Sequence, residues 1–298
     1  MMAAMQQTLR GTLKLNEPMS RHTSWRVGGP AERYYEPADI DDLAEFLAQL
    51  PDKEPLLWVG LGSNLLVRDG GIRGTVIMTS GLLNEIELLD EGLVRAEAGV
   101  ACAKVARFCA RQHLVGVEFL AGIPGTMGGA LAMNAGAFGG ETWRNVAAVE
   151  TIDRSGRRHL RQPVEFEVAY RRVTGMPGEW FVAAHLRLHR GDSETATAQI
   201  KQLLERRSAT QPIGLPSCGS VFRNPEGDHA ARLIEACGLK GSCIGGACVS
   251  EKHANFIINT GNATAAEIEA LIEKVAAEVE RQHSVQLIRE VHIVGEVA

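Results

Sequence analysis

The chain has 298 residues, of which 45% are hydrophobic and 22% charged, and its formal net charge is −5. The length indicates about two domains, and the composition allows a sizeable hydrophobic core. Because the net charge is negative and the arginines are scattered, the chain offers no basic field for nucleic acid, and we expect no nucleic-acid partner. Met1–Ser20 lacks the apolar stretch of a signal peptide, and no segment is apolar enough to span a membrane. We therefore expect a cytoplasmic protein without a membrane partner.

The six cysteines do not show the spacing of a disulfide framework, and we expect reduced thiols. Cys237, Cys243 and Cys248 precede His253, which raises the question of a metal site. However, the chain has no CxxC pair, and structural zinc sites usually place two ligands a few residues apart. The sequence therefore predicts small buried thiols and no metal.

In the first part of the chain, short apolar runs alternate with glycine-rich turns. Pro37–Leu50 has apolar residues at helical spacing behind an acidic first turn, and Ala101–Gln112 is also a predicted helix. Strands are predicted at Leu56–Val59, Thr75–Met78, Leu93–Ala98, Ala147–Ile152 and Trp180–Leu188. Arg154–Gly156 is a turn signal that predicts a hairpin.

The sequence changes character near residue 190, where we place a domain boundary. Beyond it, Ala196–Arg207 and His229–Cys237 are predicted helices, and a proline-punctuated loop lies between them. Thr264–His283 is the clearest helix, because a capping box precedes one apolar stripe. Val285–Val294 is predicted as a final strand. The fold class is therefore α+β.

Two glycine-rich stretches carry the main functional signal. Gly116–Gly140 is long and nearly free of charge, and Val59–Gly71 follows an apolar run. Glycine contributes no side chain to a core, so such runs are expected where backbone N–H groups approach a large ligand. Two separated turns fit a long ligand with a central pyrophosphate, which indicates a dinucleotide. Gly60–Leu65 lacks the third glycine of a Rossmann turn, and no P-loop lysine is present, so a nest of N–H groups is expected instead.

Several segments, in their order along the chain, resemble one flavoenzyme family. They are His22–Pro30 (HTSWRVGGP), Gly62–Val67 (GSNLLV), Gly122–Gly129 (GIPGTMGG), Tyr170–Arg171, Gly219–Pro225 (GSVFRNP) and Leu287–Val291 (LIREV). On these segments the chain is similar to UDP-N-acetylenolpyruvoylglucosamine reductases of the MurB type. The glycine turns are shared with other flavoproteins of the vanillyl-alcohol-oxidase type, whereas GSVFRNP with the late glutamate is far more specific. Little sequence separates Tyr170–Arg171 from the next predicted strand, which indicates the shorter subclass without a lid-loop insertion.

This resemblance implies a non-covalent FAD in a domain of the vanillyl-alcohol-oxidase (PCMH) type over residues 1–190, divided into two α+β parts near residue 80. Residues 191–298 would form a smaller α+β substrate-binding domain, and the last strand, about 285–298, would return to the FAD domain. The residues that would contact FAD are Gly60, Gly62, Ser63, Asn64, Leu65, Gly122, Ile123, Pro124, Gly125, Gly128, Gly129, Asn134 and Gly136.

The resemblance also implies the reaction. NADPH, as co-substrate, reduces FAD, and the flavin then reduces the enolpyruvyl ether of UDP-N-acetylglucosamine to UDP-N-acetylmuramate, a peptidoglycan precursor. Arg171 would bind the substrate carboxylate and stabilise the enolate, Glu290 would act alongside it, and Ser220 would deliver the proton to C2. Contacts to the UDP-sugar would come from Tyr170, Gln211, Arg223 and Asn224, with Arg206 and Arg207 as further cations.

Each catalytic residue also has an ordinary structural explanation. Ser220 is typical of a loop serine that bonds its own backbone, and Arg171 beside Arg172 of a solvated pair. Glu290 is typical of the exposed face of an alternating strand, and it reaches the flavin only if that strand returns. Two other functions stay open, an FAD-dependent oxidase or dehydrogenase of related fold and a non-catalytic nucleotide-binding protein. The presence of Arg171, Ser220 and Glu290 together favours the reductase.

Overall fold

The computed structural model describes residues 9–298, so the expectation for Met1–Ser20 lies partly outside the described residues. The chain divides into two compact units. Among the described residues, unit 1 comprises residues 9–14, Tyr34–Leu61 and Gly74–Arg206, and unit 2 comprises Leu15–Arg33, Gly62–Arg73 and Arg207–Ala298. The assignment of residues 1–190 and 191–298 to cofactor and substrate domains stays a prediction. Within residues 9–298, no helix is both long enough and apolar enough to cross a membrane.

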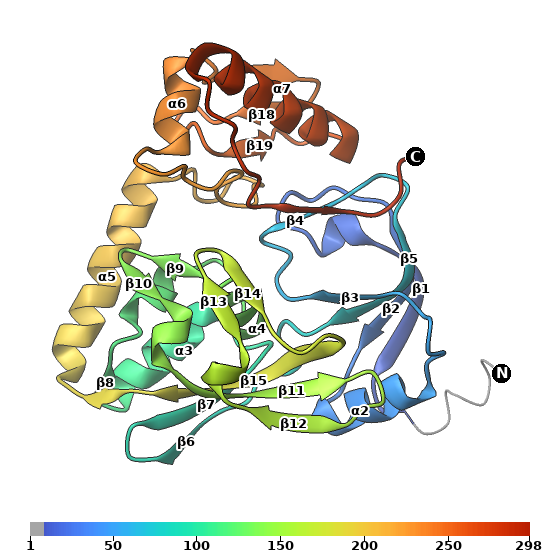
Figure 1. The fold of residues 1–298 in the computed structure, drawn as a ribbon, viewed down its shortest axis with the longest axis vertical. Coiled ribbons are helices and arrows are strands. Elements are labelled where there is room, and N and C mark those ends of the chain that lie inside the picture. The colour runs from blue at the N-terminus through green and yellow to red at the C-terminus, as the bar shows by residue number, and fades with distance from the viewer. Residues whose placement is uncertain (1–8) are drawn as a thin grey trace. The chain divides into compact units, whose positions relative to one another are not determined.

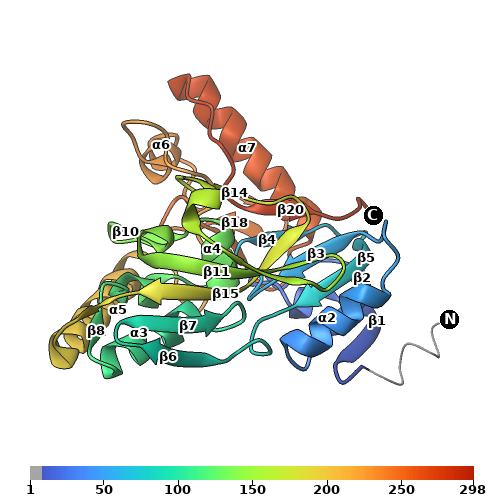
Figure 2. The same ribbon diagram turned by 60° about the horizontal axis from the view of Figure 1, so that its bottom comes forward.

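The N-terminal strands form a four-stranded sheet with a helix against it. The strand order is β1 (Thr12–Pro18), β2 (Pro30–Glu36), β5 (Ile72–Met78) and β3 (Leu56–Val59), and η1 (Met19–Arg21) follows β1. α2 (Ile40–Gln49) begins after Asp39, whose side chain accepts the N–H of Asp42 as a helix cap does. α2 lies beside these strands (Figure 2). Phe46 of α2 stacks on Tyr35 of β2 with ring centroids 3.7 Å apart, so the apolar face of the helix is turned toward them.

The core of unit 1 is a five-stranded antiparallel sheet. Its order is β12 (Arg158–Arg161), β11 (Val146–Asp153), β15 (Glu179–Arg187), β7 (Leu93–Glu97) and β6 (Ile86–Asp90). α3 (Cys102–Arg111) and α4 (Met127–Ala132) contribute Val105 and Leu131 to the core over this sheet (Figure 1). The short elements of this unit are β8 (Leu114–Val115), η2 (Glu118–Gly122), β9 (Gly136–Ala137), β10 (Gly140–Glu141), η3 (Thr142–Asn145), η4 (Pro163–Glu165), β13 (Glu167–Ala169), β14 (Arg172–Thr174) and β16 (His189–Arg190).

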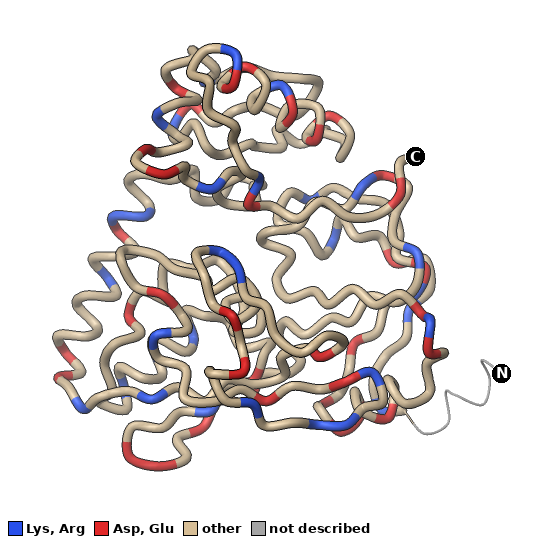
Figure 3. The backbone as a smooth tube through the Cα atoms, viewed as in Figure 1, with Lys and Arg blue, Asp and Glu red and all other residues tan. Residues whose placement is uncertain are grey.

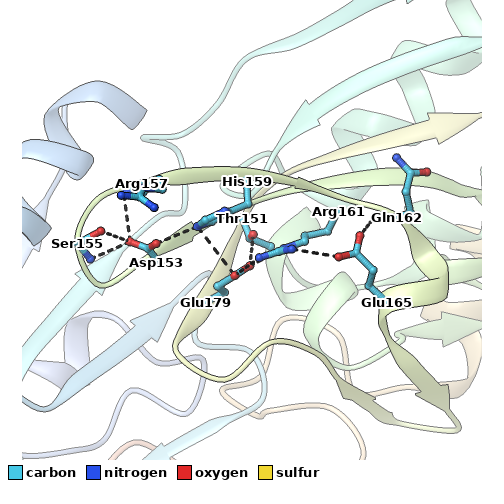
Figure 4. A network of polar contacts seen from close by, with 9 residues as sticks. All are labelled: Thr151, Asp153, Ser155, Arg157, His159, Arg161, Gln162, Glu165 and Glu179. Atoms are coloured by element: carbon cyan, nitrogen blue, oxygen red, sulfur yellow. Dashed lines mark hydrogen bonds and ion pairs between the residues drawn. The ribbon is translucent and has the colours of Figure 1, made fainter.

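A polar network on β11, β12 and β15 holds the predicted hairpin, which the structure confirms (Figure 4). Asp153 accepts hydrogen bonds from the hydroxyl and the backbone N–H of Ser155, which closes the turn. His159 Nε2 lies 2.8 Å from the second Asp153 oxygen, and Glu179 accepts a bond from Arg161 at 3.1 Å. Serine, histidine and aspartate together could form a catalytic triad. Here, however, Ser155 bonds to the Asp153 carboxylate and not to His159, so the group lacks the hydrogen bond between nucleophile and base. Its role is to hold three strands together.

Unit 2 is built around one long helix. α7 (Ala265–His283) begins at the predicted capping box, in which Thr264 and Glu267 each accept the backbone N–H of the other. The apolar stripe of α7 shares one core with α6 (Ala230–Ala236) and with the sheet of β17 (Cys243–Ile244), β18 (Ala247–Val249) and β19 (Ile257–Asn259) (Figure 1). α5 (Ser193–Thr210) runs through the division between the units at residue 206.

The C-terminal segment returns to an early part of the sequence, but as a shorter strand than predicted. β20 (His292–Val294) pairs in parallel with β4 (Leu65–Val67). Residues 285–291 are irregular and form one antiparallel bridge, between Arg289 and Phe222. The strand predicted over Val285–Val294 is therefore wrong for most of its length. The reason lies in its partners, because β4 has three residues and the loop around Phe222 offers a single pair.

One disulfide corrects the expectation of reduced thiols throughout. Cys243 and Cys248 lie opposite each other on β17 and β18, and their sulfur atoms are bonded. They are 5 positions apart in sequence, and the tight hairpin brings them side by side, which their spacing alone did not indicate. Two of the cysteines considered for a metal site are thus joined to each other. The free cysteines are Cys102, Cys109, Cys218 and Cys237.

Charged residues of both signs are interspersed along the described backbone (Figure 3). Many form ion pairs, as Arg68 does with Glu269 and Arg95 with Glu150. This mixed pattern agrees with the small negative net charge. It differs from the basic face that a protein needs to bind a nucleic-acid backbone.

Candidate active site

Within unit 1, the stretch Gly116–Gly140 folds as turns around the short helix α4. The N–H of Met127 donates to the carbonyl of Val100 and the N–H of Gly128 to the carbonyl of Ala98, both at 2.8 Å. A Cβ on Gly128 would lie 2.9 Å from the Cβ of Ala98. Gly128 therefore allows α4 to pack closely, and its N–H is already engaged inside the protein.

Thr126, directly before α4, is a buried residue whose hydroxyl has no hydrogen-bond partner among residues 9–298. A Cβ on Gly60 would lie 2.4 Å from this hydroxyl oxygen, so glycine at position 60 leaves it room. A Cβ on the exposed Gly129 would meet only the same oxygen, at 3.8 Å, so the packing of α4 does not require glycine there.

These features fit a phosphate-bearing cofactor such as FAD. Buried hydroxyls normally have a partner, and a glycine inside a helix costs about 1 kcal/mol relative to alanine. The Thr126 hydroxyl can donate to a phosphate oxygen, and the open space over Gly129 lets a ligand approach the backbone. The sequence interpretation did not name Thr126, although it is the only hydroxyl residue in GIPGTMGG. That hydroxyl next to glycines was the available signal.

The other predicted cofactor residues of this stretch form a loop held by its own backbone. The N–H of Ile123 donates to Leu120, and Gly125 accepts the N–H of Cys102 at 2.9 Å. Gly122 ends η2, and a Cβ on it would lie 2.5 Å from the Phe138 ring. Pro124 is exposed on the same loop. Backbone hydrogen bonds and close packing therefore fix the conformation of this loop.

Asn134 and Arg171 lock the end of the glycine-rich stretch. Both have positive φ angles, 41° and 54°, which cost an ordinary residue about 1 kcal/mol or more. The Asn134 side chain accepts the N–H of Trp143 at 3.2 Å and donates to the Ala169 carbonyl at 3.3 Å. The Arg171 guanidinium donates to the carbonyls of Gly136 at 2.9 Å and of Asn134 at 3.4 Å. The Asn134 side chain thus bonds within the protein and shapes the turn that receives Arg171.

Tyr170 and Arg171 form the two-residue turn between β13 and β14. The Arg171 guanidinium lies 5.1 Å from the centroid of the Tyr170 ring, and Tyr170 is half exposed. Arg172 instead pairs with Glu167 at the surface, at 2.6 Å. The explanation of two solvated arginines therefore applies to Arg172 alone. Arg171 is held against the backbone of the glycine-rich stretch.

In unit 2, the turn Gly62–Leu65 is tightly built. Gly62 has a φ of 63°, and a Cβ on it would lie 2.0 Å from the carbonyl oxygen of His22, so only glycine fits. Ser63 is half-buried, and Leu65 begins β4. Asn64 donates its side-chain amide to the Glu290 carbonyl at 3.1 Å. This long-range bond links the predicted cofactor turn to the segment that carries Glu290.

Ser220 and Glu290 are brought to neighbouring segments of unit 2 by backbone pairing. The N–H of Glu290 donates to the Val221 carbonyl at 2.8 Å. The N–H of Arg223 donates to the Ile288 carbonyl at 2.9 Å, and Phe222 bridges Arg289 between these two bonds. Ser220, one residue before Val221, therefore lies at the start of a segment whose partner holds Glu290. Both side chains are half-buried, and Glu290 is not on the open face of a regular strand.

Cys218 attaches the start of the Ser220 segment to the Gly62–Leu65 turn. Its Sγ lies 3.6 Å from the Gly62 carbonyl and 3.5 Å from the Leu65 carbonyl, as a thiol donor. Burial raises the pKa of this thiol to about 12, so it stays protonated at neutral pH. Cys218 is therefore a structural donor and not a nucleophile.

The expected substrate contacts of unit 2 lie close to these segments along the chain. The Asn224 side-chain carbonyl accepts the N–H of Ala230 at the start of α6, at 3.1 Å. Gln211 accepts from Arg207 at 3.1 Å, and burial lowers the pKa of Arg207. Arg223 is half-buried; burial and the nearby Arg223 charge both lower the pKa of His292. Asn224 and Gln211 thus each use one acceptor inside the protein and keep an amide group that can donate.

Two protein-family models match this chain, and their ranges include the segments described above. Residues 31–160 match a family model described as an FAD binding domain. Residues 211–294 match one described as the C-terminal domain of UDP-N-acetylenolpyruvoylglucosamine reductase. The first match includes the Thr126 and Asn134 turns, and the second includes Ser220 and Glu290.

Whole-length relatives carry the same description. The UDP-N-acetylenolpyruvoylglucosamine reductase of Alkalilimnicola ehrlichii is 64% identical over 296 residues, which cover 99% of each chain. That of Legionella pneumophila is 62% identical over 288 residues, which cover 96% of this chain and 94% of the relative. The crystal structure of UDP-N-acetylenolpyruvylglucosamine reductase (MurB) from Thermus caldophilus superposes with a TM-score of 0.81 at 31% identity, and covers 96% of this chain and 99% of that one.

Proposed function

This chain belongs to the UDP-N-acetylenolpyruvoylglucosamine reductase family, and we propose that it reduces the enolpyruvyl ether of UDP-N-acetylglucosamine to UDP-N-acetylmuramate with NADPH and FAD. It is an FAD-dependent oxidoreductase of peptidoglycan synthesis that acts on a small UDP-sugar. FAD, held by the glycine-rich turns, would supply the hydride chemistry of the reaction. The protein supplies binding, orientation and one proton.

The cofactor is held by the glycine-rich turns. The open face of Gly129 and the Thr126 hydroxyl, beside Gly60, support a phosphate contact in unit 1. Gly62–Leu65 contributes a second turn in unit 2 with a backbone that only glycine permits at position 62. We assign residues 1–190 to cofactor binding and residues 191–298 to substrate binding, with the β20 segment returning to β4.

Arg171 binds the carboxylate of the enolpyruvyl group and stabilises the charge that develops when the double bond is reduced. A fixed cation aimed at developing charge is usually the largest catalytic contribution. The carbonyls of Gly136 and Asn134 support this role, because they hold the guanidinium before substrate arrives. Its planar fork matches a carboxylate better than a lysine ammonium does.

Ser220 donates its hydroxyl proton to C2 of the substrate, and solvent restores that proton. An enolate carbon is strongly basic, so a neutral hydroxyl is acidic enough for the transfer. Glu290 acts alongside on the neighbouring segment. The observation that carries this part of the proposal is the Phe222–Arg289 bridge with its flanking bonds, which sets the Ser220 and Glu290 segments side by side.

A UDP-sugar substrate and NADPH support a cytoplasmic location, and the short connection between Arg171 and β15 supports the subclass without a lid-loop insertion. The test is the anaerobic absorbance of the purified protein during addition of NADPH and then the enolpyruvyl UDP-sugar. We expect flavin absorbance that is lost with NADPH and restored by the sugar nucleotide. Restoration only on admission of air would identify an oxidase, and a protein that takes up no added FAD would contradict the proposed function.

A further inference from the structure

Asn255 is a buried side chain in the loop between β18 and β19 that the reaction scheme does not use. It is 3% exposed and lies in unit 2, as Ser220 and Glu290 do. Its loop is compact, because the Ser250 hydroxyl accepts the N–H groups of Lys252 and His253. The N–H of Ser250 also donates to the Phe256 carbonyl at 2.8 Å. Asn255 is therefore presented from a rigid turn.

The Asn255 amide bonds to both backbone groups of Phe222. Its Nδ2 donates to the Phe222 carbonyl at 2.8 Å, and its Oδ1 accepts the Phe222 N–H at 3.0 Å. In addition, the Asn255 carbonyl accepts the N–H of Val221 at 2.9 Å. One residue thus makes three hydrogen bonds to two consecutive residues of the Ser220 segment.

The Phe222–Arg289 bridge explains why this clamp is needed. The bonds of that bridge belong to Val221 and Arg223, so the N–H and carbonyl of Phe222 point to the opposite edge. Phe222 is 1% exposed, and its backbone groups would be buried there without water. The Asn255 amide takes the place of a neighbouring strand at this edge. An unsatisfied buried group costs about 1–3 kcal/mol, so loss of the amide would shift the segment.

Such a shift would be transmitted to Ser220. On the other side of Ser220, Gly219 has a φ of 73° and a Cβ there would meet nothing within 4 Å, and the anchor on that side is Cys218, two residues before Ser220. The bonds of Val221 and Phe222 to Asn255 hold the residues that directly follow Ser220. We propose that Asn255 is a positioning residue, which acts through the Phe222 backbone to hold the Ser220 hydroxyl at the substrate C2 carbon. This inference rests on the proposed function of Ser220 as proton donor.

The test uses the FAD-loaded full-length Asn255→Asp variant. Aspartate keeps an acceptor for the Phe222 N–H but places a carboxylate oxygen against the Phe222 carbonyl. We expect NADPH to reduce the bound flavin within about twofold of the wild-type rate. Restoration of flavin absorbance by the enolpyruvyl UDP-sugar should slow about 10²-fold, the usual effect of a small misplacement of a catalytic group. The product should contain both configurations at C2, because solvent then protonates either face.

The matched control is Asn259→Asp. Asn259 is also buried in unit 2, donates to the Trp25 carbonyl at 2.8 Å and accepts the N–H groups of Gly261 and Ala263. This variant should lose similar stability yet retain wild-type turnover per bound flavin and a single C2 configuration. If Asn255→Asp does not accumulate as folded protein, the uncharged Asn255→Ser variant provides the same readout.

Wild-type turnover per flavin and a single C2 configuration in the Asn255 variants would overturn the inference. A slow step in the flavin reduction by NADPH, matched by the Asn259 control, would also overturn it, because it would indicate a general structural effect. Failure of the proposed function is distinguishable, since the wild-type flavin itself would then not be restored by the sugar nucleotide.

Discussion

The candidate residues of unit 1 and those of unit 2 differ in what holds them. In unit 1, Arg171 bonds to Gly136 and Asn134, residues 35 and 37 positions away. In unit 2, Asn64 bonds to Glu290 across 226 positions. Those of unit 1 depend on residue types that permit close approach or a positive φ, whereas those of unit 2 depend on backbone pairing between distant segments. Residue type therefore indicates where a ligand can approach the backbone, whereas backbone pairing determines which side chains come close together.

A large effect is expected at Arg171 in unit 1. Arg171→Ala should lower kcat about 10²–10³-fold, because it removes a cation aimed at the developing charge. Steady-state kinetics with the enolpyruvyl UDP-sugar measure this. Arg172→Ala is the control, since its salt bridge with Glu167 is at the surface and contributes little. Equal losses in the two variants would show that the Gly136 and Asn134 bonds do not distinguish Arg171.

The sequence predicted elements that have a local pattern better than elements that depend on pairing between distant segments. The helices α2, α3 and α7 and the strand β3 lie where local patterns placed them, because an apolar periodicity and a cap are readable within one segment. The Val285–Val294 strand was wrong, because its length is set by β4 and Phe222, which are distant in sequence. Pairing of this kind leaves no local signal.

The same contrast applies to the site. The glycine turns were readable as residue types, whereas Ser220 and a return of the C-terminal segment to the FAD domain were expected from the resemblance. The pairing of β20 with β4 is what the structure shows. The unpartnered Thr126 hydroxyl and the Asn255 clamp were not found, because a threonine or an asparagine has many ordinary uses. The Cys243–Cys248 pair was missed because only the hairpin register sets these cysteines opposite each other.

Asp42 is not one of the candidate site residues, and a substitution there should change stability without changing catalysis. Asp42 is buried and accepts bonds from the Tyr35 hydroxyl and from the N–H groups of Arg10, Gly11 and Ala38. Burial acts to raise the pKa of Asp42, but these hydrogen bonds outweigh it and hold the pKa below its usual value. Asp42→Asn should lower the free energy of unfolding by about 1–3 kcal/mol at neutral pH and leave turnover per flavin unchanged.

The pH dependence of this effect follows from the direction of the shift. A depressed pKa stabilises the folded state above the unfolded pKa of about 3.9, and that contribution is lost as the pH falls through the lower folded value. The stability difference between wild type and Asp42→Asn, measured by denaturant unfolding, should therefore shrink below about pH 4. A difference that grows on acidification would contradict this account of Asp42.

The smallest expected effect concerns the space over Gly129. Gly129→Ala should raise the stability of the cofactor-free protein by about 0.5–1 kcal/mol, because alanine is the better helix residue and the site has room. The same change should weaken FAD binding, measured by fluorescence titration. Gly128→Ala is the contrasting variant, since its Cβ would lie 2.9 Å from that of Ala98 and should destabilise the protein. Unchanged FAD affinity in Gly129→Ala would place the cofactor elsewhere.

The most direct test of the account is a single-turnover experiment on Ser220→Ala. The variant should bind FAD and be reduced by NADPH at the wild-type rate, since Ser220 takes no part in that half of the reaction. Restoration of flavin absorbance by the enolpyruvyl UDP-sugar should be about 10²–10⁴-fold slower, as expected for loss of a proton donor. Restoration at the wild-type rate would contradict the assignment of Ser220 and, with it, the role of the backbone pairing that sets it beside Glu290.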